Sequence, residues 1–479
     1  MASLNEILTI GNSGLLASKS LLQMAGFNIA NANTPGYARR TAQLQAQAVL
    51  GMGVSVDDPR AVRNELVSRH LNSTYGDRGF HEGQLSGLNL VQEAFNDLDG
   101  VGLGVSFNNF EDALAALAGN PAGATERQAV LNAATALGTS FGSTRSQLQD
   151  GQDSTLQQAR AVADDVSFKA QQVHGLNQRI KAMTENGRDV GGLVDQRAAL
   201  ISSLSSQMAV QVVHQTDGSV LLYAGGGRPL VGGDGASRVV VSEPSPSTDV
   251  PPLQIEISFD KPSGENLVAL QDAGGQLGGL VAAQNDVIGP TIRQMDELAF
   301  EFARQFNIVH DAGFDFNGTG GAGGAPGSGD FFFFTDPATG AVPIIENFAS
   351  NLRLSDTVEN DPNAIRASSN AADVPGGNLN ANIMRDFINQ PGLFPGVSAK
   401  DVYSGLVLEV ASAKQAASVG FEIETGSVTQ LETMLESEIG VSVDEELIRM
   451  TQANQSFEAA SQVIRNADQM SQTILSLLG

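Results

Sequence analysis

Apolar residues recur with a heptad rhythm at both ends of the chain. Near the start, large apolar side chains stand at every seventh position with mostly smaller ones between them: Leu8, Leu15, Leu22 and Ile29, then Leu4, Ser18, Ala25 and Ala32. Near the end, a second set follows steps of three and four residues, and an apolar stripe extends it: Leu447, Met450, Asn454, Phe457, Ser461 and Ile464, then Met470, Ile474 and Leu478. This spacing predicts a long amphipathic helix at each terminus.

Neither terminal helix can bury its own apolar stripe, so each one needs a partner. We expect the two helices to pack on each other, or on neighbouring copies of the chain, as a coiled coil. An ordinary amphipathic helix at each end of a globular bundle is the alternative on periodicity alone. Because Ser18, Asn454 and Ser461 bury little apolar surface, we also expect both helices to be poorly ordered in the monomer and to fold on assembly.

Helical patterns continue into the first half of the interior. Helices are expected at 62–98 and 126–183. The second would reach roughly 80 Å, at about 1.5 Å per residue, unless it breaks near Asp150-Gly151. A rod-shaped domain is therefore expected.

Strand patterns begin near Met208, where short apolar runs flank Asp217-Gly218, a dipeptide that favours the tight turn of a β-hairpin. The other expected strands are 238–242, 253–259, 331–334 and 341–345. A helix at 276–311 and a glycine-rich loop at 318–329 interrupt them, and helix returns near Asp401.

This layout predicts a multidomain protein of mixed α and β structure. The N- and C-terminal regions would form a long-helix coiled coil or bundle, and the middle of the chain would supply a β-rich insert. The expected domains are a terminal coiled-coil (inner) domain of 1–58 plus 440–479, a long-helix rod domain of 59–208 plus 399–439, and a β-rich outer domain of 209–275 plus 313–398. The helix at 276–312 fits either the rod or the insert.

The composition excludes several classes of function. Acidic residues number 53 against 27 basic ones, and the resulting net charge of -26 argues against nucleic acid or an anionic membrane as a partner. No stretch approaches the roughly 20 apolar residues that cross a bilayer. The absence of cysteine excludes disulfides and thiolate metal sites. The first ten residues have neither a basic leader nor a continuous apolar core, so no cleavable signal peptide is predicted.

A search for catalytic chemistry gives little. The five histidines are scattered without metal-ligand spacing, which favours structural roles: His70, His81, His174, His214 and His310. Nucleophile-elbow, phosphate-loop and zinc-protease motifs are missing from the sequence. We therefore expect no enzyme activity, no catalytic residue, no metal and no cofactor.

Two segments resemble functional features and need a second interpretation. Residues 311–318 are similar to a calcium-binding loop, but the alignment puts Gly313 at the first ligand position and Gly324 at the last, so a turn held by Asx side chains is favoured. The four phenylalanines at 331–334 would make either an exposed adhesive patch or a buried strand, and their risk of aggregation favours burial.

A sharp exit from the first helix is predicted at 28–37, where the sequence reads NIANANTPGY. Pro35 disfavours helical geometry at Thr34, and Pro35 followed by Gly36 suits the centre of a type II turn. The helix should therefore end by about Ala32. Its asparagines can bond to the free backbone groups at the end of the helix.

The whole string resembles the signature of the flagellar axial proteins, which include the rod, hook and hook-associated proteins. Its matching residues are Asn28, Asn31, Asn33, Thr34, Pro35, Gly36 and Tyr37. GVSVDEEL at 440–447, NQSFEAA at 454–460 and the residues at 464–468 are similar to the closing helix of that family. Interior strings are similar to hook-associated protein 1: NP at 120–121, RQAV at 127–130, DQR at 195–197, 225–230, GGL at 278–280 and GFDFNG at 313–318.

The resemblance implies an extracellular structural protein of the flagellum, needed for filament assembly and motility. It would form a ring at the distal end of the hook and adapt the flexible hook to the rigid filament, with hook protein below and the second hook-associated protein above. Its implied assembly interface is the inner coiled coil: Leu8, Leu15, Leu22 and Ile29 opposite Leu447, Met450, Phe457, Ile464, Met470 and Ile474.

The resemblance also implies secretion in unfolded form through the flagellar export apparatus, with a chaperone on the C-terminal helix. Larger relatives contain a further outer domain that the shorter insert here leaves in doubt. The alternatives are another axial component, a secreted binding module whose insert recognises a glycan or host surface, and an insert with enzymatic activity.

Overall fold

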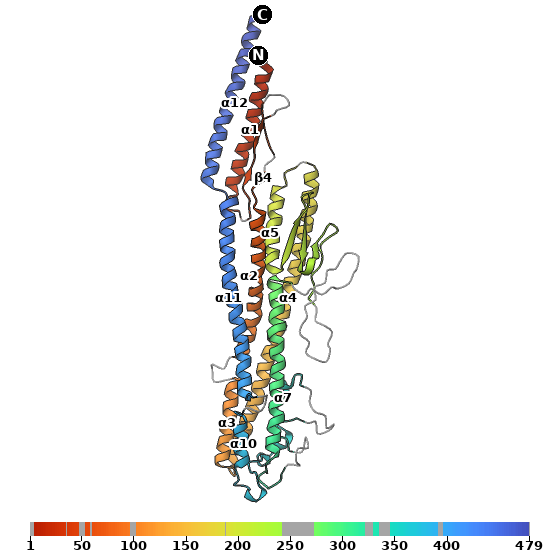
Figure 1. The fold of residues 1–479 in the computed structure, drawn as a ribbon, viewed down its shortest axis with the longest axis vertical. Coiled ribbons are helices and arrows are strands. Elements are labelled where there is room, and N and C mark those ends of the chain that lie inside the picture. Colours follow the sequence, from red (N-terminus) through yellow and green to blue (C-terminus); the bar gives the residue numbers. More distant parts are fainter. Residues whose placement is uncertain are drawn as a thin grey trace.

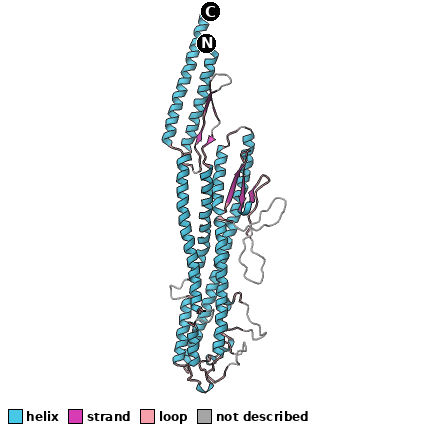
Figure 2. Cartoon of the chain, in the orientation of Figure 1, coloured by secondary structure: helices cyan, strands magenta, loops and turns pink. Residues whose placement is uncertain are grey.

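The computed structural model describes residues 4–34, 36–46, 53–57, 60–95, 102–186, 188–241, 273–320, 329–334, 345–390 and 396–478. They form a long rod of helices with both chain ends at the same tip (Figure 1). Helices predominate, and strands occupy only the region beside that tip and one side of the rod (Figure 2). The prediction of terminal helices around a β insert is confirmed. Within the described residues, no helix is both long and apolar enough to span a membrane.

The tip of the rod contains α1 (Leu4–Ala30) and α12 (Val443–Leu478), and small antiparallel ladders lie beside them. One ladder pairs β1 (Arg40–Thr41) with β4 (Arg60–Ala61), and the other pairs β2 (Leu44–Ala46) with β3 (Val54–Val56). The two helices run antiparallel, because the start of α1 and the end of α12 lie together (Figure 1). The prediction that the terminal helices pack on each other is confirmed.

The rod is built from long helices that return along its length. They are α2 (Glu65–Gln92) with the 3-10 turn Glu93–Phe95, α3 (Leu103–Gly119), α4 (Ala124–Glu185), α5 (Gly191–Gln207) and α11 (Ala399–Ile439). α4 is 62 residues long and continues through Gly151 without a break. α2 begins later than predicted because the Asn64 side chain caps it, accepting hydrogen bonds from the amides of Leu66 and Val67.

The helix predicted at 276–311 is continuous. It consists of α6 (Gly275–Ala282), a π-helical turn (Ala283–Ile288) and α7 (Gly289–Asp311). α6 lies against α2, with backbones in close contact: a Cβ on Gly279 would stand 1.9 Å from the carbonyl oxygen of Phe80. α7 packs in the core of the far half of the rod with α3, α4 and α11.

The β insert is a three-stranded antiparallel sheet in the order β5 (Val210–His214), β6 (Val220–Ala224), β7 (Arg228–Val231), with the 3-10 turn Gly225–Gly227 before β7. The predicted hairpin at Asp217-Gly218 is confirmed, and Gly218 has the positive φ of +81° that the turn requires. The buried face of the sheet shares a core with α4, α5 and α6.

Two predicted strands are wrong for the same physical reason: a polar side chain of a helix takes the place of a strand partner. At 238–241, the amide of Val239 donates to the hydroxyl of Ser167 in α4 at 2.8 Å. At 331–334, the side-chain oxygen of Asn307 accepts from the amides of both Phe331 and Phe332 on one edge. On the other edge, backbone pairing with 353–355 is limited to a single bridge between Phe332 and Leu354. The strand predicted at 253–259 and most of that at 341–345 lie outside the described residues.

The described part of 313–398 is not β-rich as predicted. Three short helices, two 3-10 turns and isolated bridges make it up: α8 (Phe348–Asn351), α9 (Asp356–Asn360), Pro362–Ala364, Ala371–Asp373 and α10 (Leu379–Phe387). It covers the end of the rod opposite the termini and shares the core of α3, α4 and α7. Phe331 and Phe332 are fully buried there, so the prediction of burial for the phenylalanine run is confirmed for these two residues.

Candidate functional site

The contact between α1 and α12 runs along small residues. Gly11, Ser18 and Ala25 are buried on α1, while Ala453 and Ala467 are buried on α12. A Cβ on Gly11 would stand 2.7 Å from the Cγ1 atom of Ile464. Each helix therefore presents small side chains at seven-residue steps, which lets the two backbones approach closely.

The large residues predicted to form this contact lie partly beside it. Leu8, Leu15, Leu22 and Ile29 are half-buried, as are Met450, Phe457 and Ile464. The other three predicted residues are exposed: Leu447 by 43%, Met470 by 56% and Ile474 by 50%. The structure thus leaves seven of the ten partly covered by the α1–α12 pair, with Ile464 directly against Gly11, and three exposed.

Sequence reasoning placed Ser18 and Ala25 in the heptad pattern but missed Gly11 on α1 and the alanines of α12. The sequence contains a signal for this contact: Gly11, Ser18 and Ala25 are spaced seven residues apart, and so are Ala453, Ala460 and Ala467. The larger side chains were given more weight because they bury more apolar area. A close helix pair instead needs small residues on the line of contact and large ones on each side.

The outward faces of the two terminal helices are rich in exposed apolar side chains. They are Ile10, Leu16 and Phe27 on α1, and Leu447, Ile448, Val463, Met470 and Ile474 on α12. An apolar surface of this length on a two-helix unit is typical of an association site. The pair is therefore suited to pack against further helices.

Asn28 of the signature joins α1 to the start of α12. Its side chain is fully buried and donates to Oε2 of Glu446 at 3.1 Å and to the carbonyl of Arg40 at 2.9 Å. Its oxygen accepts from the amide of Arg40 and the hydroxyl of Tyr37. The Glu446 side chain is only 1% exposed, so this amide helps to satisfy a buried carboxylate.

The rest of the signature forms the exit turn. The amide of Tyr37 donates to the carbonyl of Thr34 at 3.1 Å, and Gly36 has a φ of +78°, the conformation that a type II turn requires there. The Asn31 side chain caps the helix end by donating to the carbonyl of Phe27. Asn33 is exposed, and Pro35 lies outside the described residues.

Ion pairs join this tip to the rod at a region that we call the neck. Arg39 pairs with Glu445 at the start of α12, and Arg40 pairs with Asp189 just before α5. Arg63 pairs with Asp195 in α5. Burial raises the pKa of the Asp195 carboxyl, against the opposing effect of Arg63 and Arg40. The charged groups of the neck are therefore matched by opposite charges, with Arg40 and Asp195 largely buried and Glu445 and Asp189 exposed to solvent.

Two motifs singled out in the sequence hold distant segments together. In DQR, Asp195 contacts the neck, while Arg197 donates to the Asn177 side chain of α4 and to the carbonyl of Gly218 in the hairpin turn. Burial lowers the pKa of Arg197 to about 10. The string therefore connects the neck, α4 and the sheet.

In RQAV, the buried guanidinium of Arg127 donates to backbone carbonyls from two other parts of the chain, those of Pro121, Pro362 and Ile365. It also stands over the ring of Phe316, 5.3 Å from the ring centre. These contacts fix the short helices of 345–390 to the start of α4.

The candidate chemical sites have structural roles. The Asp315 side chain accepts from the amides of Asn317 and Thr319, so the predicted Asx turn is confirmed. His310 is buried between the carbonyl of Gly329 and the amide of Arg366. Within the described residues, no three histidine or acidic side chains converge as metal ligands.

Comparison with known proteins agrees with this architecture. Residues 88–325 match the model of the flagellar hook-associated protein FlgK helical domain, and residues 434–477 match that of the flagellar basal body rod FlgEFG protein C-terminal region. A solved structure titled as the flagellar hook junction protein FlgK from Burkholderia pseudomallei has the same fold, with a TM-score of 0.63 at 17% identity. That match covers 78% of this chain and 100% of the other.

Curated relatives are named flagellar hook-associated protein 1. The protein from Bacillus subtilis is 24% identical over 97% of this chain and 96% of its own length. The protein from Escherichia coli is 27% identical over 70% of this chain and 61% of its own length. With two family models at the expected places, the chain belongs to the flagellar hook-associated protein 1 family of structural flagellar proteins.

Proposed function

We propose that this chain is the junction component between hook and filament, assembled as a ring at the distal end of the hook. The observation that carries this proposal is the α1–α12 pair, whose outward faces are apolar and exposed along their length. In a ring, the pair of each copy would pack against the pairs of its neighbours. The relatives named hook-associated protein 1 support the same position.

The shape of the chain fits an adapter between a bendable tube and a rigid one. The terminal pair would form the inner wall of the ring, and the rod would extend outward from the neck with the sheet on its surface. The ten predicted interface residues would then act in two ways. The seven half-buried ones would support the pair itself, and Leu447, Met470 and Ile474 would contact neighbouring copies.

We propose hook protein below and the second hook-associated protein above as the partners of the ring. The chain would reach that position through the flagellar export apparatus, with a chaperone on the apolar face of α12. The role is structural and not enzymatic. Arg127, Asp315 and His310 are the buried or hydrogen-bonded side chains that could suggest catalysis, and each of them instead holds backbone segments together.

Deletion of the gene tests the proposal. Electron microscopy of the deleted cells should show hooks without filaments, a swimming assay should show no motility, and unpolymerised flagellin should accumulate in the medium. A copy of the gene supplied in trans should restore filaments. Normal filaments on the deleted cells would overturn the proposal and favour a binding role for the β insert.

A further inference from the structure

The rod contains two separate buried cores that meet at one level. The near core joins the sheet to α4, α5 and α6, while the far core joins α3, α4, α7 and α11. α4 runs through both cores: Leu148 is its last residue in the far core, and Leu156 is its first in the near core. The helix of 275–311 passes from one core to the other between Leu280 and Ala283. We call this level, with 149–155 of α4 and the π-helical turn Ala283–Ile288, the core boundary.

The helices that cross the core boundary place polar or small residues inside it. On α4 the buried residues there are Gly151, Gln152 and Thr155. On α2 the residue is Gly87, where a Cβ would stand 3.0 Å from the Cβ of Ala283 and 3.4 Å from the Cγ2 of Thr155. The boundary therefore contributes little of the apolar packing that makes a bundle of helices resist bending.

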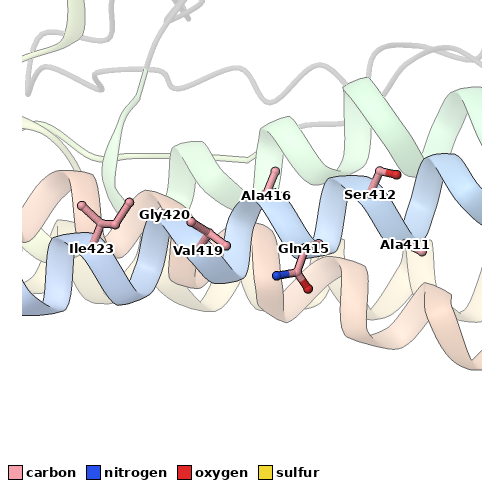
Figure 3. A pocket seen from close by; sticks show the side chains of 7 residues that line it. All are labelled: Ala411, Ser412, Gln415, Ala416, Val419, Gly420 and Ile423. Carbon is pink, nitrogen blue, oxygen red and sulfur yellow. The ribbon is translucent and has the colours of Figure 1, made fainter.

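α11 also passes this level with small residues. Its place is fixed by Lys414, which bonds to the Gln92 side chain of α2, and by Gly420, which lies against the ring of His81. Of the described residues between these two, Ala417 alone is buried. On its outer side, α11 forms a shallow groove here, and all the residues that line it come from this helix, as Figure 3 shows: Ala411, Ser412, Gln415, Ala416, Val419, Gly420 and Ile423. α11 thus adds no large buried side chain at the core boundary.

A Gly-Pro pair explains the π-helical turn in the helix of 275–311. Pro290 has no amide hydrogen, so it cannot donate to the carbonyl of Asp286 four residues earlier. Just before it, the amide of Gly289 donates to the carbonyl of Gln284, five residues earlier, which is the bond of a π-helix. Prolines and π-helical turns are the places where helices bend most often.

The side chain of Gln284 is buried in this turn without a partner. It is 1% exposed, and neither its amide nitrogen nor its amide oxygen bonds to another described residue. Burial of an unpaired amide is unfavourable, because water would bond to both of these atoms. A conformation of the rod that admits water to the core boundary would therefore give Gln284 hydrogen bonds that it lacks in the closed rod.

The packing is tight on both sides of the core boundary. In the near core, α2 and α6 are in backbone contact: a Cβ on Gly83 would stand 2.2 Å from the carbonyl oxygen of Gln276. In the far core, the rings of Phe107 and Phe302 pack edge to face, with their centres 5.4 Å apart. Each half of the rod should therefore move as a rigid body, and bending should be concentrated between them.

We infer that the core boundary is a hinge, at which the far half of the rod bends relative to the near half. The bend opens one side of the boundary, and water then bonds to Gln284. The hinge belongs to the single chain, but its use rests on the proposed function. In a ring, the outer halves of neighbouring rods would shift as the hook curves, while the inner halves and the terminal pairs keep their contacts.

Spin-label distances in the purified full chain test the hinge, because the chain has no cysteine of its own. Phe168→Cys with Ile308→Cys places one label on each side of the core boundary. The controls are Ala136→Cys with Ile308→Cys inside the far half and Leu66→Cys with Phe168→Cys inside the near half, and all four positions are exposed. Pulsed electron spin resonance in frozen solution records the range of distances in each pair. The distribution should be at least about twice as wide for the spanning pair as for either control, and equal widths would overturn the hinge.

Two substitutions should stiffen the core boundary, each for its own reason. Gln284→Leu replaces the unpaired amide with an apolar side chain of similar size and so joins the two cores. Pro290→Ala restores an amide that can donate to Asp286. Each should narrow the distribution of the spanning pair to the width of the controls, while Gln178→Leu, on the exposed side of α4 in the near half, should leave it wide. A distribution that stays wide in both Gln284→Leu and Pro290→Ala would overturn the placement of the hinge at this boundary.

The hinge and the junction role can fail separately, because the spin-label measurement needs no assembled ring. Equal widths, together with hooks that lack filaments in deleted cells, would remove the hinge and keep the junction role. A wide spanning distribution, together with normal filaments on deleted cells, would keep the hinge and remove the junction role.

Discussion

Asn28 lies fully buried between α1, β1 and the first turn of α12, and both polar atoms of its side chain are bonded. Its position explains a signature asparagine in physical terms. An amide both donates and accepts, so it can bond to the carbonyl and the amide of Arg40 while it also donates to Glu446. A carboxylate or a methyl group could not replace all of these contacts.

Replacement of Asn28 by alanine is expected to loosen the neck. The amide of Arg40 would lose its acceptor, and the buried Glu446 carboxylate would lose a donor, so the free energy that protects the Arg40 amide from hydrogen exchange should fall by about 1–3 kcal/mol. Asn33→Ala, in the same segment but exposed, is the matched control and should change little. Equal protection in the two variants would contradict the role given to Asn28.

His310 should make the stability of the rod depend on pH. Burial, with a further effect of Arg366, lowers its pKa to about 3. In the unfolded chain the His310 ring binds a proton with an ordinary pKa near 6.5, whereas in the folded chain the ring stays neutral in this range. The free energy of unfolding should therefore fall by about 1.4 kcal/mol per pH unit below about pH 6. Stability above pH 7 should not depend on this group.

The measurement is urea unfolding between pH 7 and about pH 5, a range above the ordinary pKa of carboxyl groups. His310→Gln should reduce the slope of the free energy of unfolding against pH. His70→Gln, at an exposed position, should leave that slope unchanged. An unchanged slope in His310→Gln would show that another group is responsible.

At the scale of elements, the close contact of α2 with α6 depends on glycine. Gly279→Ala would place a methyl group against the backbone carbonyl of Phe80. Because the contacted atoms belong to the backbone and not to a movable side chain, the substitution should reduce the free energy of unfolding by about 1–3 kcal/mol. Gly175→Ala on α4 meets nothing within 4 Å and should raise it by about 0.5–1 kcal/mol. Thermal or urea unfolding of both variants checks the difference, and a loss in both would contradict the packing argument.

The terminal pair is expected to be the least stable helical unit in the isolated chain. Small residues line its contact, its outward faces are exposed, and it packs on little besides the ladders of β1 to β4. Hydrogen exchange of the monomer should show fast exchange along α1 and α12 and slow exchange along α4, with the terminal helices becoming protected on assembly. Strong protection of both terminal helices in the monomer would contradict folding on assembly.

The sequence predicted the helices better than the strands and the contacts. The long periodic patterns of α4 and α11 fit a helix and few other kinds of secondary structure. The strands at 331–334 and 238–242 were wrong because Asn307 and Ser167, far away in the sequence, bond to the backbone groups that a neighbouring strand would have used. The exact line of the α1–α12 contact was missed because apolar area was weighed above closeness of approach.

At the scale of the whole molecule, the chain is a rod with its association surfaces on the outside and its polar contacts on the inside. Arg127, Asn28 and Arg197 each join segments far apart in the sequence, and together they connect the tip, the sheet and the far end. The apolar faces of α1, α12 and α11 are left for other molecules. Such a distribution is typical of a subunit that is completed by its neighbours.

The junction role can be tested most directly by locating the protein on the flagellum. A single cysteine at the exposed Leu379, labelled with maleimide-gold and viewed by electron microscopy, should appear as one band where hook meets filament. In cells without flagellin, the same band should cap the free ends of the hooks. Label spread along the hook or the filament, or found only on the cell body, would contradict the account.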